Sequence, residues 1–107
     1  TTITTSLARR EALADIAMHY SVPIIEDDAY AALPTEPVTP LAQLAPALTY
    51  YVAGLSKCFG AGLRTAFVRA PDARQAQRLA GALRATTVMA SPVTTAIATR
   101  ALQDGTA

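Results

Sequence analysis

The chain has 107 residues, of which 51% are hydrophobic and 16% charged, and its formal net charge is +1. This length suits one domain with a modest core, and the near-neutral charge gives no electrostatic basis for nucleic-acid binding by this segment. A single cysteine, Cys58, excludes an internal disulfide framework and fits a reducing compartment. No apolar run approaches the ~18–20 residues of a membrane span, and the N-terminal stretch lacks the apolar region of a signal peptide. The sequence therefore predicts a soluble, cytoplasmic chain, part of whose apolar surface is covered by something else.

The first part of the chain predicts a helix followed by a buried strand. Residues 7–19 have the pattern of an amphipathic helix with Ser6 as its N-cap. Residues 22–25 form an apolar run interrupted by Pro23, and three acids follow at 26–28. We therefore predict a buried strand whose carboxyl end carries negative charge. The inner face of the helix is expected to hold Leu13, Ile16, Ala17 and Tyr20.

The remainder of the chain alternates strands and helices, which indicates an α/β fold. Residues 31–47 contain four prolines and predict a surface loop. Strands are predicted over 48–53 and 65–68, and helices from Pro71 onward and over 92–104. The helix after Pro71 is expected to turn inward Ala76, Leu79, Ala80 and Leu83. Apolar strands need cover on both faces, which these helices supply only in part, so the chain is interpreted as part of a larger domain.

Side chains that carry chemistry stand at the ends of the predicted strands. Asp27 and Tyr30 follow the first strand, Ser56 and Lys57 follow the second, and Arg64 precedes the third. In open α/β sheets ligands bind beyond the carboxyl ends of the strands, so these groups are expected to converge on one crevice. A carboxylate, a phenol, a hydroxyl, an amine and a guanidinium suit a ligand with a basic ring nitrogen, an ionisable oxygen, an aldehyde and a phosphate. Pyridoxal 5′-phosphate has all four groups.

The stretches EDDAY, GLSK and GLR resemble the fold-type I pyridoxal-phosphate aminotransferases, in particular the aminotransferase-like domains of MocR/GntR transcriptional regulators. The resemblance covers most of the chain, from SLARREALADIA to ASPVTTAIATRALQDGTA. Its most specific part is the SK-x6-R spacing after a D-x-x-Y.

This resemblance implies the three-layer αβα architecture of a fold-type I large domain with a mostly parallel sheet. Residues 1–107 would form part of that pyridoxal-phosphate-binding domain, with its N-terminal part and the small domain lying outside. A homodimer is also implied, because the cofactor site of this family lies at a dimer interface. DNA would be contacted only through a domain outside this segment, and no membrane contact is implied.

The resemblance assigns a role to each of the five site residues. Lys57 would be the Schiff-base lysine, held partly desolvated, and its released amine would act as the base that moves protons. Asp27 would pair with the pyridine nitrogen and keep it protonated, so that the ring acts as an electron sink. Tyr30 would hydrogen-bond the phenolic oxygen of the ring. Ser56 and Arg64 would bind the phosphate.

One position departs from the family pattern. Gly54 stands three residues before the lysine, where the family often has a serine or threonine, so phosphate binding would depend on Ser56, Arg64 and groups outside this segment. The family's asparagine, glycine-rich phosphate loop and stacking aromatic precede the position of Thr1. Its substrate-carboxylate arginine lies beyond Ala107. We therefore expect this segment to carry the Schiff-base half of a site and to be inactive alone.

Each assigned residue also has a simpler interpretation. Lys57 could be a solvated lysine at a strand end, and Asp27 could belong to a solvated acidic turn. Tyr30 could be a packed core aromatic. Ser56 could be a turn residue, and Arg64 could form a surface salt bridge.

Other residues are predicted to be structural. Cys58 is expected to be a buried small hydrophobe and His19 a surface or capping residue. Arg9 and Arg10 are expected to lie on a solvated helix face. The acids at 26–28 have no further ligands at matching spacing, so no metal site is predicted.

Two classes of function follow from the resemblance, and the segment could also be a structural piece without activity of its own. In the preferred one, the domain senses the cofactor or an amino-acid adduct and controls DNA binding by a GntR/MocR-type regulator, because the tail ASPVTTAIATRALQDGTA resembles that branch. In the alternative, it is a large-domain segment of an aminotransferase that moves an amino group from an amino acid to a 2-oxo acid. A basic helix-turn-helix domain upstream of Thr1 would select the regulator.

Overall fold

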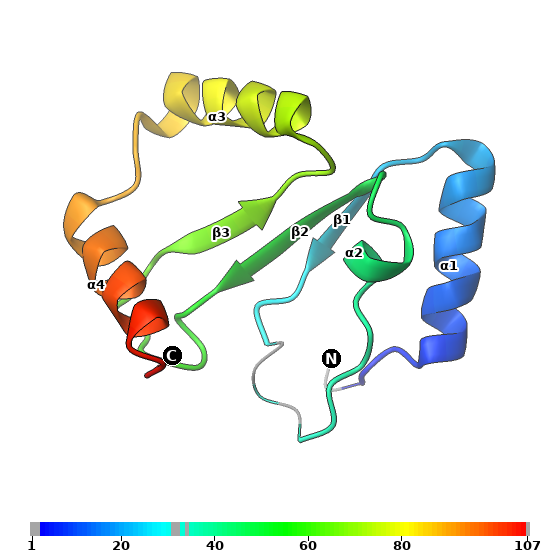
Figure 1. The fold of residues 1–107 in the computed structure, drawn as a ribbon, viewed down its shortest axis with the longest axis horizontal. Helices are drawn as coiled ribbons and strands as arrows, with labels where there is room; N and C mark the ends of the chain where they lie inside the picture. Colours follow the sequence, from blue (N-terminus) through cyan, green and yellow to red (C-terminus); the bar gives the residue numbers. More distant parts are fainter. Residues whose placement is uncertain (1–2, 31–32, 34, 107) are drawn as a thin grey trace.

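A computed structural model of the chain describes residues 3–30, 33 and 35–106. Its elements follow the predicted order, with a short helix added inside the predicted loop 31–47. Residues 31, 32 and 34 of that loop lie outside the described residues. The elements are α1 (Leu7–Tyr20), β1 (Ile24–Asp27), α2 (Leu41–Leu44), β2 (Thr49–Gly54), β3 (Ala66–Arg69), α3 (Ala73–Thr87) and α4 (Pro92–Gln103) (Figure 1).

The three longer helices start at side-chain caps. Ser6 Oγ accepts a hydrogen bond from the backbone N–H of Arg9 at 3.4 Å, which confirms the predicted cap of α1. Asp72 caps α3 in the same way, through a 2.7 Å bond from a backbone N–H, and Ser91 caps α4 just before a proline in its first turn. At the other end of α1, Ser21 has a φ of 52°, a left-handed conformation that stops the helix.

The three strands form a mixed sheet with β2 in the centre. β1 pairs with β2 in parallel, and β3 pairs with β2 antiparallel. One of the two pairings is therefore parallel, whereas the mostly parallel sheet was predicted for the larger domain, of which these three strands would be a part. Residues 55–65 are the whole connection from β2 to β3, whereas a parallel crossover needs about a dozen residues or more, usually with a helix. Residues 28–48 connect β1 to β2 and include α2, which leaves room for the parallel pairing.

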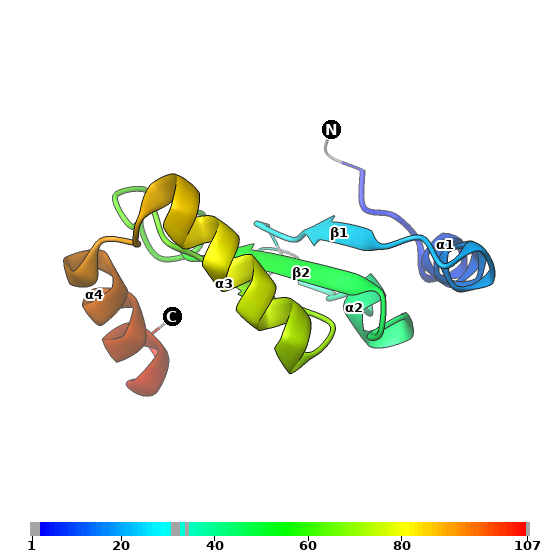
Figure 2. The ribbon, with the colours of Figure 1, turned by 90° about the horizontal axis from the view of Figure 1, so that it is seen from above.

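The helices surround the sheet unevenly. α2 packs against β2 and α1, while α3 and α4 lie on the β3 side of the sheet (Figures 1 and 2). The core is small and built mainly from alanine and short side chains. Its buried members are Ala14, Ala17, Ala42, Ala45, Thr49, Leu55, Leu63, Ala98 and Ala101.

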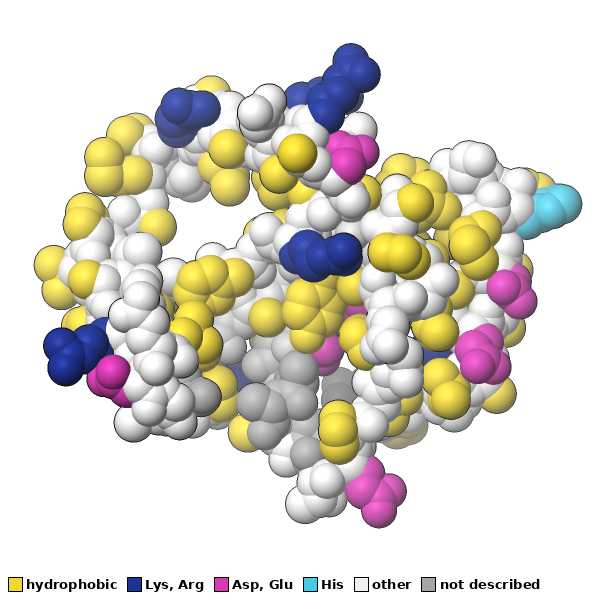
Figure 3. Space-filling view, in the orientation of Figure 1, with side chains coloured by type: hydrophobic (Ala, Val, Ile, Leu, Met, Phe, Trp, Pro, Cys, Tyr) yellow, Lys and Arg dark blue, Asp and Glu magenta, His cyan; other side chains and the backbone are white. Residues whose placement is uncertain are grey.

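Large apolar side chains remain at the surface. In α1 the prediction of an inward Ala17 is confirmed, but Leu13 and Ile16 are 44% and 56% exposed. α3 has no buried residue, and its predicted inward Leu83 is also exposed. Hydrophobic side chains are visible over the helices and the sheet in the space-filling view (Figure 3). The apolar residues of α3 gather on one face as predicted, whereas those of α1 do not, so the predicted amphipathic pattern is wrong for α1, whose buried residues are Ala14 and Ala17. Nothing among the described residues covers the exposed apolar side chains.

One apolar groove of about 530 Å³ lies between α3 and the sheet. Tyr50 closes one side of it, where its hydroxyl donates to Gln75 Oε1 at 3.2 Å. Its lining is Pro23, Ile25, Tyr50, Val52, Val68, Gln75, Arg78 and Leu79. None of the described helices is long and apolar enough to cross a membrane.

Candidate functional site

The carboxyl ends of β1 and β2 meet at one edge of the sheet. Asp27 lies opposite Val52 in the parallel register, and the backbone N–H of Asp28 donates to Val52 O at 2.9 Å. β3 starts at the same edge, because Ala66 lies opposite Gly54. The backbone segments that carry all five predicted site residues therefore reach this edge.

The turn after β2 is fixed by two leucines. Leu55 and Leu63 are buried, each 7% exposed. Leu55 O accepts the backbone N–H groups of Phe59 at 2.9 Å and Gly60 at 3.2 Å, and Gly60 O accepts that of Leu63 at 2.9 Å. These contacts give the turn a defined shape although Lys57, Cys58 and Phe59 within it are exposed.

This turn presents the second set of site residues. Ser56 is half-buried, and Lys57 and Arg64 are exposed. Lys57 is the single lysine of the chain. Its exposure means that the described residues do not supply the partial desolvation that the sequence led us to expect.

Tyr30 lies beside the lysine. Lys57 Nζ stands 5.6 Å from the centroid of the Tyr30 ring, within the range of a cation–π contact. Tyr30 is 59% exposed, so the interpretation as a packed core aromatic is wrong. The structure thus brings together the amine after β2 and the phenol after β1, which are far apart in sequence.

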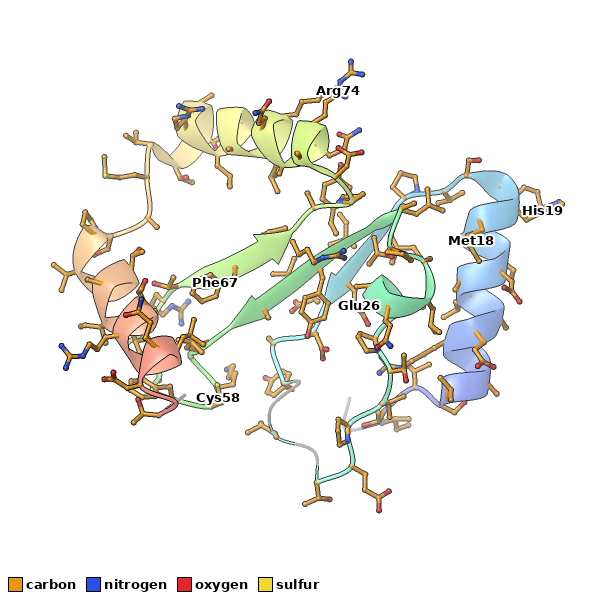
Figure 4. The ribbon with its side chains drawn as sticks, viewed as in Figure 1. Met18, His19, Glu26, Cys58, Phe67 and Arg74 are labelled. Carbon is orange, nitrogen blue, oxygen red and sulfur yellow. The ribbon has the colours of Figure 1, made fainter. Side chains whose placement is uncertain are left out.

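The three acids at the end of β1 have different environments. Glu26 is buried at 8% exposure and points from β1 toward α2 (Figure 4). Asp28 Oδ2 accepts the hydroxyl of Tyr51 at 2.9 Å. Asp27 is exposed, and its Oδ1 accepts only the nearby backbone N–H of Ala29, at 3.2 Å. The solvated acidic turn is therefore wrong for Glu26, whereas Asp27 is solvated in this structure.

The environment of Tyr51 affects its ionisation. Burial raises the pKa of its phenol to about 12, and the hydrogen bond to Asp28 and the charges of Asp28 and Glu26 act in the same direction. The neutral phenol is therefore the form that donates to Asp28. This contact fixes the residue that follows Asp27.

Arg10 was predicted on a solvated helix face, which is wrong. Its guanidinium is 15% exposed and pairs with Glu26 Oε1 at 3.3 Å, whereas Arg9 is exposed as predicted. The contact was missed because it joins α1 to β1, and no sequence spacing reports such a pair. The alternation of side chains along β1 was the available signal, since it places Glu26 on the face opposite to Asp27.

Two further predictions on single residues have different outcomes. Cys58 is exposed in the turn, with its Sγ 3.9 Å from the carbonyl oxygens of Gly54 and Leu55, so its predicted burial is wrong (Figure 4). His19 is exposed near the end of α1, as predicted, and its ring packs edge-to-face on Tyr20 with centroids 4.7 Å apart. Among the described residues no group of three or more His, Cys, Asp or Glu could hold a metal ion.

Close packing explains why a glycine occupies position 54. A Cβ at this position would lie 3.2 Å from the backbone oxygen of Thr65 and 3.8 Å from Ala66 Cα. A serine or threonine there would require the β2–β3 pair to move by a few tenths of an ångström. The missing hydroxyl is thus linked to the close approach of β3.

The exposed groups at this edge fit pyridoxal 5′-phosphate. Within residues 3–30, 33 and 35–106, Asp27, Lys57 and Arg64 form no ion pair, so their charges are available. A primary amine can bind an aldehyde, a carboxylate can pair with a ring nitrogen, and a guanidinium with a hydroxyl can bind a phosphate. The chain offers each of these partners on segments that reach one edge.

Comparison with known proteins gives two findings. The family described as "Aminotransferase class I and II" matches residues 1–107. Over 71 residues the chain is 39% identical to a protein of Bacillus subtilis (strain 168) named "Uncharacterized HTH-type transcriptional regulator YdeF". That alignment covers 66% of the chain but 15% of the relative, so the chain corresponds to a small part of the relative's length.

Proposed function

The chain belongs to the aminotransferase class I and II family, and we propose that it is a pyridoxal-phosphate-binding segment of the effector-binding domain of a GntR/MocR-type transcriptional regulator. The observation that carries this proposal is the Lys57 amine 5.6 Å from the Tyr30 ring, at the sheet edge where Asp27 ends β1. The printed name of the relative, an HTH-type transcriptional regulator, supports the regulatory role.

Each site residue has one task in this proposal. When bound, pyridoxal phosphate supplies an electrophilic aldehyde and an electron-accepting ring. Lys57 Nζ would hold the aldehyde carbon, with the aldehyde oxygen leaving as water, and its free amine would serve as a base. Asp27 holds a proton at the ring nitrogen, and Tyr30 donates to the phenolic oxygen. Ser56 and Arg64 hold the phosphate, and Arg64 can do so through two parallel N–H bonds.

The regulator acts as a cytoplasmic homodimer in this proposal. An amino acid is its effector, and DNA is contacted by a domain outside the 107 residues. The second candidate is an aminotransferase that transfers an amino group to a 2-oxo acid. The retained amine of Lys57 and carboxylate of Asp27 favour this candidate, since both serve the proton transfers of such a reaction.

Borohydride reduction of the full-length protein with pyridoxal phosphate tests the site. We expect a pyridoxyl group on Lys57, identified by peptide mass spectrometry. Because Lys57 is the only lysine in the segment, any lysine labelling within it reports this side chain. Lys57→Arg keeps the positive charge and should abolish the label. A label confined to lysines elsewhere in the folded protein would refute the assignment.

A second measurement separates the two candidate functions. Full-length protein is mixed with amino acids, and DNA affinity and release of 2-oxo acids are measured together at one stated salt concentration. The regulator is supported if an amino acid changes the protein's affinity for DNA, this change depends on Lys57, and there is no net release of a 2-oxo acid. Sustained release of a 2-oxo acid with unchanged DNA affinity supports the enzyme.

A further inference from the structure

Glu26 and Arg10 form a buried, hydrogen-bonded cluster next to Asp27 that has no role in the proposed function. Glu26 accepts three hydrogen bonds: Oε1 from Arg10 Nη1 at 3.3 Å and the N–H of Leu41 at 2.9 Å, and Oε2 from the N–H of Ala42 at 2.9 Å. Both carboxylate oxygens are thus engaged, and Glu26 is 8% exposed. A buried carboxylate with this many partners fixes the strand from which it projects.

Arg10 connects this cluster to two other segments. Its Nε donates to Thr5 O at 3.0 Å, and its Nη1 also donates to Thr39 O at 3.4 Å. One guanidinium thereby joins the approach to α1, the end of β1 and the residues before α2. The planar fork of arginine makes these simultaneous contacts possible, whereas a lysine ammonium is a single point of charge.

β1 needs such support. It has four residues and pairs within the described chain only with β2, while its Ile25 is 78% exposed. Side chains alternate along a strand, so holding Glu26 on the α2 face directs Asp27 to the opposite face. On the other side of Asp27, Asp28 is held by Tyr51. Asp27, the candidate partner of the cofactor's ring nitrogen, therefore lies between two acids whose side chains are held by hydrogen bonds.

We infer that Glu26 and Arg10 are positioning residues, which hold the Asp27 carboxylate where it pairs with the ring nitrogen of bound pyridoxal phosphate. This inference rests on the proposed function. Glu26 and Arg10 do not contact the cofactor. They act by fixing the rotation of β1 about its axis. Replacing either residue should therefore weaken the pairing of the Asp27 carboxylate with the protonated ring nitrogen, while Lys57 keeps its position.

The test uses full-length protein loaded with pyridoxal phosphate that carries ¹⁵N at the ring nitrogen. Solid-state ¹⁵N NMR reports whether that nitrogen is protonated, and a mere loss of stability does not move the signal of the folded protein. In Glu26→Gln we expect the signal to move toward the unprotonated position, in the same direction as in Asp27→Asn and by a smaller amount. Arg9→Gln, an exposed neighbour on α1, should leave the signal unchanged.

The outcomes separate this inference from the proposed function. A folded Glu26→Gln protein with the wild-type signal, beside a shifted signal in Asp27→Asn, overturns the inference and leaves the proposed function intact. An unshifted signal in Asp27→Asn overturns the role of Asp27 and the inference with it. If Glu26→Gln does not fold, Arg10→Lys carries the same test: a shift smaller than that of Asp27→Asn supports the inference, and a wild-type signal overturns it.

Discussion

The ion pair between Arg10 and Glu26 should dominate the local stability of β1 and α2. At 3.3 Å and an effective dielectric of about 20, the attraction between the two charges is about 5 kcal/mol, which their desolvation partly cancels. Breaking a buried pair from one side costs about 3–5 kcal/mol. In Arg10→Met, Glu26 keeps its two backbone N–H partners, so we expect a smaller loss of about 2–3 kcal/mol.

Hydrogen exchange in the full-length protein can measure this loss locally. The backbone N–H groups of Leu41 and Ala42, which donate to Glu26, should exchange roughly 30- to 150-fold faster in Arg10→Met, because each 1.36 kcal/mol is tenfold. Arg9→Met is the matched control and should stay within about 0.5 kcal/mol of wild type. Equal exchange rates in the two variants would show that the ion pair does not stabilise this region.

Three further results are expected. The raised pKa of Tyr51, from 10.0 to about 12, means that its stabilising effect is complete below pH 10 and is lost as the pH rises toward 12. The difference in unfolding free energy between wild type and Tyr51→Phe should therefore shrink over that range, by at most about 2.7 kcal/mol and less after solvent screening; a constant difference would contradict this. Gly54→Ala should lower the free energy of unfolding, measured with denaturant, by about 1–2 kcal/mol, because the new Cβ would lie 3.2 Å from Thr65 O. Gly62→Ala is the control and should cost less, because no atom lies within 4 Å of its Cβ. The isolated 107-residue chain should self-associate, as measured by light scattering, and Ile25→Lys should lower its mean mass because Ile25 is 78% exposed. A wild-type chain that is monomeric at all concentrations would count against this.

The sequence predicts the elements well because their signals are local. The helix expected over 7–19 is observed at Leu7–Tyr20, and the strand expected over 48–53 is observed at Thr49–Gly54. The antiparallel direction of β3 was not predicted, because it depends on the length of a connection rather than on a pattern. The exposure of Leu13 was missed because the buried face of α1 is set by what packs against it, which selects Ala14 and Ala17, and not by where its larger apolar residues lie.

At the site, the sequence indicates residue types and spacing but not their surroundings. It singled out Asp27, Tyr30 and Lys57, and the structure brings the last two within 5.6 Å. It did not predict that Glu26 is buried, because three acids in a row have the composition of a solvated turn. The partner, Arg10, lies 16 residues earlier, and only the packing of α1 beside β1 brings them together.

The two halves of the candidate site differ in the sequence separation of the strands that form them. Lys57 and Arg64 belong to one antiparallel hairpin, whose strands find each other across the short connection 55–65. Asp27 and Tyr30 reach that hairpin only after the longer parallel crossover has closed, and such non-local pairing is slow. We therefore expect the amine and guanidinium to be in place early in folding, and the carboxylate and phenol to arrive with the docking of β1. A refolding chain would then pass through a state in which Lys57 and Arg64 are in place before Asp27 and Tyr30 lie beside them.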